Sequence, residues 1–126
     1  MSTRIVLINA LFDQFQAFLV ELCEMYPSDE DFQTFLTTIK LLRTTNPSLL
    51  PKYIYEHTSQ FESQILQKDE SFFINYSFVE YGEHVNLDIF TKLKTYVQSM
   101  NAKNKENVWK YIQNIFKLAN TLNKLS

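Results

Sequence analysis

The side chains that could take part in catalysis or metal binding are few and scattered. The chain has one cysteine, Cys23, and two histidines, His57 and His84. Cys23, His57 and Asp69 could in principle supply a nucleophile, a base and an orienting acid. Cys23 lies beside an apolar helical stripe, however, where a buried inert thiol is far commoner than a nucleophile. Zinc sites need more cysteine and histidine ligands than this chain contains. We therefore predict no catalytic residues, no cofactor and no metal.

One enzymatic alternative stays open at His84. It follows Gly82 and Glu83 in an aromatic stretch, so Glu83 and His84 could form an acid/base pair. The acidic run over 29–31 has a simpler interpretation as the first turn of a helix, where negative charge is favoured. A calcium loop would need a glycine and a distant bidentate glutamate at defined spacing, and neither is present.

The charges of the chain are distributed unevenly. Residues 1–88 hold 13 acidic and 5 basic residues, a net charge of −8, whereas residues 89–126 hold one acidic residue and 7 lysines, a net charge of +6. Lys103, Lys110 and Lys117 are spaced by seven residues, so they share one face of a helix. We favour the interpretation that these lysines serve solubility and docking onto the acidic part of the same chain. The alternative is that they face outward together and bind an acidic partner.

Nucleic acid is a less suitable partner for this chain than protein is. No arginine follows Arg43, and arginine makes most bidentate contacts to bases and phosphates. The net charge of −2 would repel a polyanion at long range. A nucleic-acid-associated accessory factor that uses the C-terminal lysines stays as the alternative function.

The stretch from 68 to 86 is the least helical and the most aromatic part of the chain. Aromatic patches often mark protein interfaces, so this stretch is the second candidate interaction surface. The alternatives are that it plugs the open end of a helix bundle, or that it forms a short strand pair. Its candidate residues are Phe72, Phe73, Tyr76, Phe78 and Tyr81.

Apolar residues recur at spacings of three and four through most of the chain, which is typical of amphipathic helices. One such helix contains Trp109, the only tryptophan, which we expect to be buried between the last helix and the first. The clearest start is at Ser28, a good N-cap before an acidic first turn. The predicted helices cover 5–26, about 29–43, about 51–67 with a kink near 57–58, 87–100 and about 104–123.

These patterns predict an all-α fold. The chain has 126 residues and a single glycine, which argues against β-hairpins and against glycine-rich phosphate loops. No linker or repeat divides the sequence. We expect one domain over 1–126, a bundle of five or six helices with an ordered aromatic-rich loop at about 68–86.

The sequence also bears on the compartment. A single cysteine cannot form an intrachain disulfide, which suits a reducing environment. The first residues lack the apolar run and the small-residue cleavage site of a signal peptide. We find no run of roughly 20 apolar residues, so we expect a protein that is neither secreted nor membrane-spanning.

Four short patterns resemble small helical proteins encoded by large nucleocytoplasmic DNA viruses. The resemblance covers about residues 11–119 and implies no catalytic residues. It implies a viral protein that acts in the cytoplasm of the infected cell or in the particle. The patterns are Pro27, Asp29, Asp31 and Phe32; Thr45-Asn46-Pro47; Lys68-Asp69-Glu70 with Phe72-Phe73; and Trp109-Lys110-Tyr111.

From these observations we expect a non-enzymatic protein. Its function would be protein–protein interaction or a structural role in the virion, with a viral or host protein as partner. Association with further copies of itself is compatible with the sequence. A nucleic-acid-associated accessory factor and, after it, a small enzyme are the alternatives.

Overall fold

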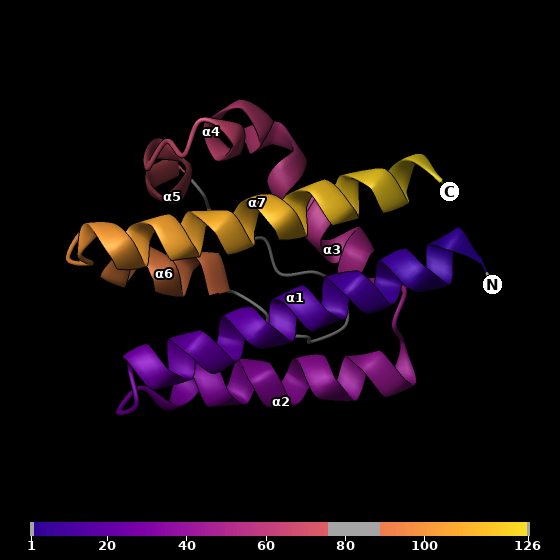
Figure 1. Ribbon diagram of the computed structural model, residues 1–126, viewed down its shortest axis with the longest axis horizontal. Helices are drawn as coiled ribbons and strands as arrows, with labels where there is room; N and C mark the ends of the chain where they lie inside the picture. Colours follow the sequence, from indigo (N-terminus) through magenta and orange to yellow (C-terminus); the bar gives the residue numbers. More distant parts are fainter. Residues whose placement is uncertain (1, 76–88, 126) are drawn as a thin grey trace.

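A computed structural model describes residues 2–75 and 89–125 of the chain, and it confirms the all-α fold (Figure 1). Within these residues there is no strand. Five of the helices have nine residues or more, and the other helical segments are shorter. The elements are α1 (Thr3–Met25), α2 (Glu30–Thr45), α3 (Leu49–Thr58), η1 (Ser59–Phe61), α4 (Glu62–Leu66), α5 (Ser71–Asn75), α6 (Ile89–Val97) and α7 (Ala102–Lys124).

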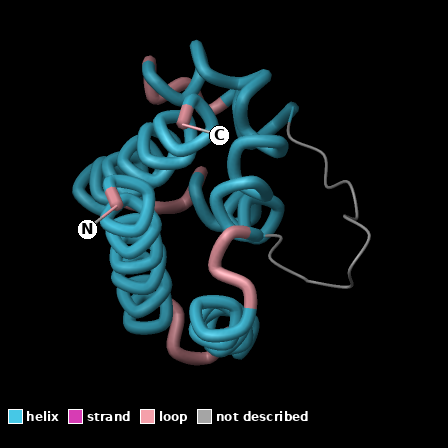
Figure 2. The backbone as a smooth tube through the Cα atoms, turned by 90° about the vertical axis from the view of Figure 1, so that its right-hand side faces the viewer, coloured by secondary structure: helices cyan, strands magenta, loops and turns pink. Residues whose placement is uncertain are grey.

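The three longest helices run along the long axis of the molecule, with α1 between α2 and α7 (Figure 1). Helices α4 and α5 lie on the other side of α7, and α6 lies beside the first half of α7. The two termini lie at the same end. Figure 2 shows the same helices from the end that carries both termini. Because α2 packs chiefly on α1, its outer side forms one edge of the molecule.

Helix α1 begins two residues earlier than predicted because Ser2 caps it. The Ser2 hydroxyl oxygen accepts the Arg4 N–H at 3.2 Å. The helix ends at Met25, before Pro27, which cannot continue it. Its apolar stripe is buried between its neighbours, as the three-and-four spacing predicts. The buried residues are Leu11, Phe12, Phe15, Phe18, Leu19 and Leu22.

By length and composition α1 could cross a membrane, since it has 23 residues and a mean hydropathy of 1.5 over its most apolar window. One such helix is weak evidence of a membrane span, so the sequence-based expectation of none stays a prediction. The helix passes because its many Ile, Leu, Val and Phe residues outweigh the polar residues between them. Helices in the core of a soluble protein pass the same test, and α1 contributes six side chains to the core.

Helix α2 is capped by Asp29, and not by Ser28 as predicted. An Asp29 side-chain oxygen accepts the Asp31 N–H at 3.0 Å, so Glu30 and Asp31 occupy the first turn. Both residues are good caps. The helix continues past Arg43 to Thr45, and the backbone N–H of Asn46 bonds the Leu42 carbonyl.

The predicted helix over 51–67 is three elements instead of one. Pro51 lies in the first turn of α3, where it removes no helical hydrogen bond. The predicted kink at 57–58 corresponds to a break. The Thr58 hydroxyl donates to the Ile54 carbonyl at 2.6 Å, and a 3₁₀ turn follows. Helix α4 then ends at Leu66 because Lys68 takes a left-handed conformation with φ of 55°, the geometry that usually calls for glycine.

The helices after the aromatic stretch differ from prediction at their ends. Helix α6 covers Ile89–Val97 and ends before the predicted end at 100, where turn hydrogen bonds from Ser99 and Met100 close it; its predicted start at 87 lies outside the described residues. Helix α7 starts earlier than predicted because Asn101 caps it, accepting the Asn104 N–H at 2.8 Å. Gly82, Glu83 and His84 lie outside the described residues.

The buried side chains of these elements form one continuous core that is rich in aromatic rings. Phe72 of α5 is fully buried in it, with the rings of Phe61, Phe90 and Trp109 at centroid distances of 5.3, 5.4 and 6.3 Å. Trp109 is 4% exposed, so its predicted burial is confirmed. Its ring neighbours are Phe72 and Phe73 of α5, however, and not residues of α1.

Candidate functional site

The row of lysines on α7 lies on the side of the helix opposite the core. Lys103, Lys110 and Lys117 are all exposed, as their spacing predicts, whereas the residues on the other side are buried. Seven residues of α-helix rise about 10.5 Å, so the three side chains are spread over about 21 Å. We call Lys103, Lys110 and Lys117 the lysine row.

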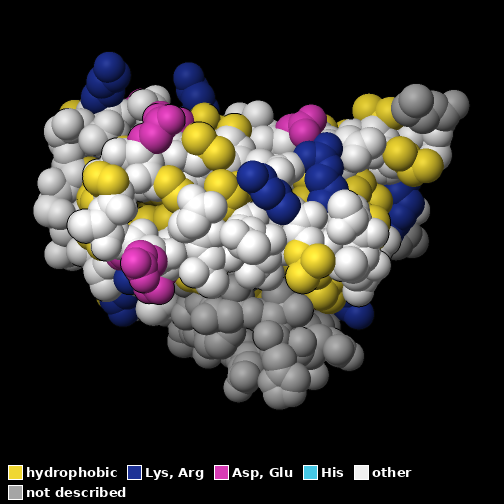
Figure 3. Space-filling view, turned by 90° about the horizontal axis from the view of Figure 1, so that it is seen from below, with side chains coloured by type: hydrophobic (Ala, Val, Ile, Leu, Met, Phe, Trp, Pro, Cys, Tyr) yellow, Lys and Arg dark blue, Asp and Glu magenta, His cyan; other side chains and the backbone are white. Residues whose placement is uncertain are grey.

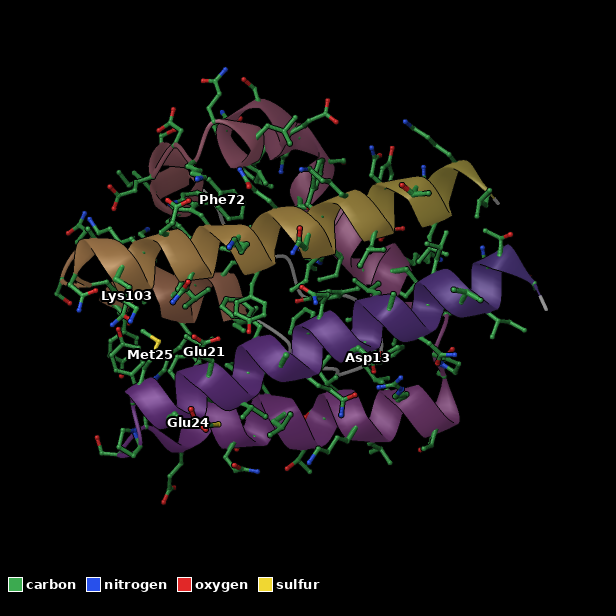
Figure 4. The ribbon with its side chains drawn as sticks, in the orientation of Figure 1. Asp13, Glu21, Glu24, Met25, Phe72 and Lys103 are labelled. Atoms are coloured by element: carbon green, nitrogen blue, oxygen red, sulfur yellow. The ribbon has the colours of Figure 1, made fainter. Side chains whose placement is uncertain are left out.

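The lysines that dock the C-terminal part onto the rest of the chain are not those of the lysine row. Lys105 pairs with Glu70 at 3.3 Å, and Glu106 pairs with Lys68. Among the described residues, no ion pair involves Lys103, Lys110 or Lys117. Figure 4 shows Lys103 on the side of α7 that faces the last turns of α1, where Glu21 and Met25 lie.

The ion pair between Glu106 and Lys68 affects the net charge around the lysine row. Glu106 is the only acidic residue after Asp88, and Lys68 offsets its charge. Helix α7 therefore keeps the positive charge of the lysine row. The favoured sequence-based interpretation was solubility and docking onto the acidic part of the chain. Lys105 and Lys92 make such docking pairs among the described residues, and for the lysine row docking stays a prediction.

A hollow of about 360 Å³ lies beside the last lysine of the row, between α1 and α7. Its lining combines one cation, one partly buried leucine and uncharged polar groups. Asn114 on its rim donates to the Gln14 side-chain oxygen at 3.3 Å, which joins the two helices there. The lining residues are Gln14, Asn114, Lys117, Leu118 and Thr121.

The second predicted surface is corrected for its first two residues. Phe72 and Phe73 are 0% and 2% exposed, so they belong to the core and cannot form an interaction surface. The short helix α5 turns both rings towards Trp109. This matches the alternative in which the stretch plugs the bundle. Tyr76, Phe78 and Tyr81 lie outside the described residues.

A polar cluster at the start of α2 was not predicted. The Nζ atom of Lys92, on α6, lies 2.9 Å from Asp29 Oδ2 and 2.7 Å from Asp31 Oδ2. The Tyr96 hydroxyl donates to Asp29, and its ring stacks on Tyr26 at a centroid distance of 3.9 Å. The acidic run over 29–31 therefore holds α6 as well as capping α2. In the sequence, the spacing of four residues between Lys92 and Tyr96 indicates that both side chains lie on one side of a helix.

The pKa values in this cluster follow from its hydrogen bonds. The bond from Tyr96, followed by the bond from Lys92, lowers the pKa of Asp29 below its ordinary value. Hydrogen bonds to Asp31 and then Asp29 raise the pKa of Lys92 above its ordinary value. The hydrogen bond to Asp29 likewise raises the pKa of Tyr96. Lys92 and Asp29 are therefore both charged at neutral pH.

The residues considered for chemistry are separated in the fold. Cys23 lies on α1, half-buried, with its thiol 3.8 Å from the Gln33 side-chain oxygen. Burial, with a smaller effect of Glu24, raises the pKa of this thiol. His57 is buried on α3, 4.3 Å from the ring of Tyr53. Within 2–75 and 89–125, no group of three His, Cys, Asp or Glu side chains could hold a metal ion.

Comparison with protein-family models, with curated proteins and with solved structures finds no match to this chain. The arrangement of its own residues is therefore the basis for the proposals that follow.

Proposed function

We propose that this protein is a non-enzymatic interaction protein whose lysine row binds an acidic segment of a protein partner. The observation that carries the proposal is the row itself: three exposed lysines on one side of α7 that make no ion pair with any described residue. A run of like charge on one rigid face attracts a partner of opposite sign and orients it.

The surroundings of the lysine row favour a protein over a nucleic acid. The hollow beside Lys117 includes Leu118, which could contact an apolar side chain of the partner. A phosphate backbone would make no use of such a contact. Binding of the same lysines to nucleic acid is the second candidate function.

Two features support the absence of enzymatic activity. The Cys23 thiol has a raised pKa, so little reactive thiolate forms near neutral pH. His57 packs against a tyrosine ring inside the protein. Neither environment suits nucleophilic or acid/base catalysis.

The resemblance to small helical proteins of large nucleocytoplasmic DNA viruses supports a place in the infected cell's cytoplasm or in the virion. We propose a role outside the membrane, because the apolar stripe of α1 is occupied by α2 and α7. Immunodetection in purified particles and in fractions of infected cells would test this placement. A signal confined to membrane fractions that resists carbonate extraction would contradict it.

Affinity capture with a matched control tests the function. The test variant is Lys103→Glu, Lys110→Glu, Lys117→Glu, and the control is Arg4→Glu, Lys52→Glu, Lys94→Glu, which changes the net charge equally. Capture from lysate at ordinary salt, with and without nuclease, should yield an acidic protein that only the test variant loses. Loss of the captured protein after nuclease treatment would favour the nucleic-acid alternative. Equal capture by both variants would reject the lysine row.

A further inference from the structure

The outer side of α2 carries a stripe of small and apolar side chains that no element of the described chain covers. Thr34, Thr37, Leu41 and Thr44 follow one another at spacings of three, four and three residues and are all exposed. They lie opposite the buried stripe of α2, which faces α1. In paired helices, residues at alternating spacings of three and four line the contact between the two helices. We call these four residues the α2 stripe.

The hydroxyl groups of this helix are already satisfied. Thr34 and Thr37 donate to the carbonyls of Glu30 and Gln33, four residues earlier, at 3.2 and 3.1 Å. Thr44 donates to the Leu41 carbonyl at 3.0 Å. A threonine whose hydroxyl bonds its own helix needs no other partner for that proton. The α2 stripe can therefore be covered by apolar groups without leaving a buried unpaired donor.

This face of α2 has a protruding side chain, Leu41, and a hollow on the same helix. Leu41 is 62% exposed, the highest value among the exposed large hydrophobic residues. About two turns earlier lies a hollow of about 410 Å³. Figure 3, which looks onto this side of the molecule, shows uncharged and apolar side chains with Lys, Arg, Asp and Glu side chains between them. The hollow is lined by Glu30, Gln33, Thr34, Thr37 and Thr38.

We propose that the α2 stripe is the contact between two copies of this chain, with their α2 helices antiparallel. A two-fold axis near Thr37 and Thr38 places Leu41 of each copy in the hollow of the other, so both hollows are filled at once. Charge selects this direction. Each copy has Glu30 at the start of α2 and Lys40 in its second half, both exposed, whereas Asp31 is paired with Lys92 of the same chain. Antiparallel packing sets opposite charges and opposite helix dipoles together, whereas parallel packing would set like charges together.

One helix face is a small contact, so we expect a weak dimer, with a dissociation constant of roughly 10–100 µM. The lysine row lies on α7, on the far side of α1 from α2 (Figure 1). A dimer formed through α2 would therefore leave the lysine rows of both copies free. The dimer does not depend on the function proposed for the lysine row.

Sedimentation equilibrium of the purified chain from about 5 to 500 µM tests the association. The parent should approach the mass of a dimer, and Leu41→Asp should weaken association at least about tenfold, because it puts a charge in an apolar contact. The matched control is Leu66→Asp, another exposed leucine, at 47%, on α4. A parent that stays monomeric would overturn the proposal. So would a dimer that Leu41→Asp leaves intact, with circular dichroism reporting the fold of each variant.

Disulfide trapping tests the direction of packing. In a Cys23→Ala background, Thr37→Cys lies near the proposed axis and should cross-link to its own copy on mild oxidation. Thr44→Cys lies on the same stripe, but its copies would be about 20 Å apart in the antiparallel dimer and should not cross-link. Cross-linking of both variants at equal rates would indicate parallel packing and overturn the proposed dimer. Absence of a cross-link in both variants would also overturn the proposed dimer.

Discussion

Lys92 and Asp29 form an ion pair of 2.9 Å that joins α6 to the N-cap of α2. Tyr96, one turn after Lys92, donates to the same aspartate. One carboxylate thus caps a helix, pairs with a cation and accepts a hydroxyl. Among the described residues, this cluster is therefore a main attachment of α6 to the first two helices.

Lys92→Met should destabilise the fold by about 1–2 kcal/mol, because it leaves two neighbouring carboxylates without their cation. Urea unfolding followed by circular dichroism measures the change. Lys94→Met, on the same helix, is the control, since its hydrogen bond to a described residue is a long one, of 3.5 Å, to the Ile74 carbonyl. Equal losses for the two variants would show that the cluster contributes little.

The stability conferred by Asp29 should depend on acid pH. Its pKa is lowered below the ordinary value of 3.8 by the hydrogen bonds from Tyr96 and Lys92. The folded protein therefore binds this proton less readily than the unfolded chain. The stabilisation is complete above the ordinary value and is lost as the pH falls through the lower, folded-state pKa.

Urea midpoints from about pH 6 to about pH 2 for the parent and for Tyr96→Phe measure this effect. The parent should be the more stable at the upper end, and the difference should shrink at the lower end. A difference that stays constant over the whole range would mean that Asp29 does not titrate differently in the two states.

The aromatic centre should dominate the stability of the bundle. Phe72→Ala should cost about 3–5 kcal/mol, since it empties a fully buried ring site against Phe61, Phe90 and Trp109. Ile74→Ala, on the same short helix but 57% exposed, should cost far less. Chemical unfolding compares the two.

Trp109 provides an optical check on the same packing, since it is the only tryptophan. Its native emission should be blue-shifted from that of the unfolded protein because the ring is 4% exposed. A native maximum typical of water would contradict its burial and the position of α5 against α7.

The Cys23 thiol should react slowly with a disulfide reagent at neutral pH. Burial raises its pKa, so the reactive thiolate is scarcer than in the unfolded chain. We expect labelling at least about tenfold slower in the folded protein than in denaturant. Labelling at the same rate in both conditions would indicate an accessible, unperturbed thiol.

Helix periodicity was readable from the chain because it is local, whereas the cap of α2 was placed one residue away from Asp29. The three-and-four spacing in 5–26 predicted the buried side of α1, and the apolar residues from Val108 to Leu122 predicted that of α7. The seven-residue spacing of Lys103, Lys110 and Lys117 was enough to predict that they share one side of a helix. Each of these predictions depends on residues within a few turns of one another.

Other features depend on residues far apart in the chain, and the tertiary structure decided them. Phe72 and Phe73 look like an exposed aromatic patch until α5 brings them against Trp109. Lys92 looks like part of a basic C-terminal region until α6 brings it to Asp29 and Asp31. The left-handed turn at Lys68 carries no glycine, and Gln113 of α7 stabilises that end of α4 by bonding the carbonyls of Ile65 and Leu66. Burial and pairing of this kind are set by which helices meet, which local spacing does not encode.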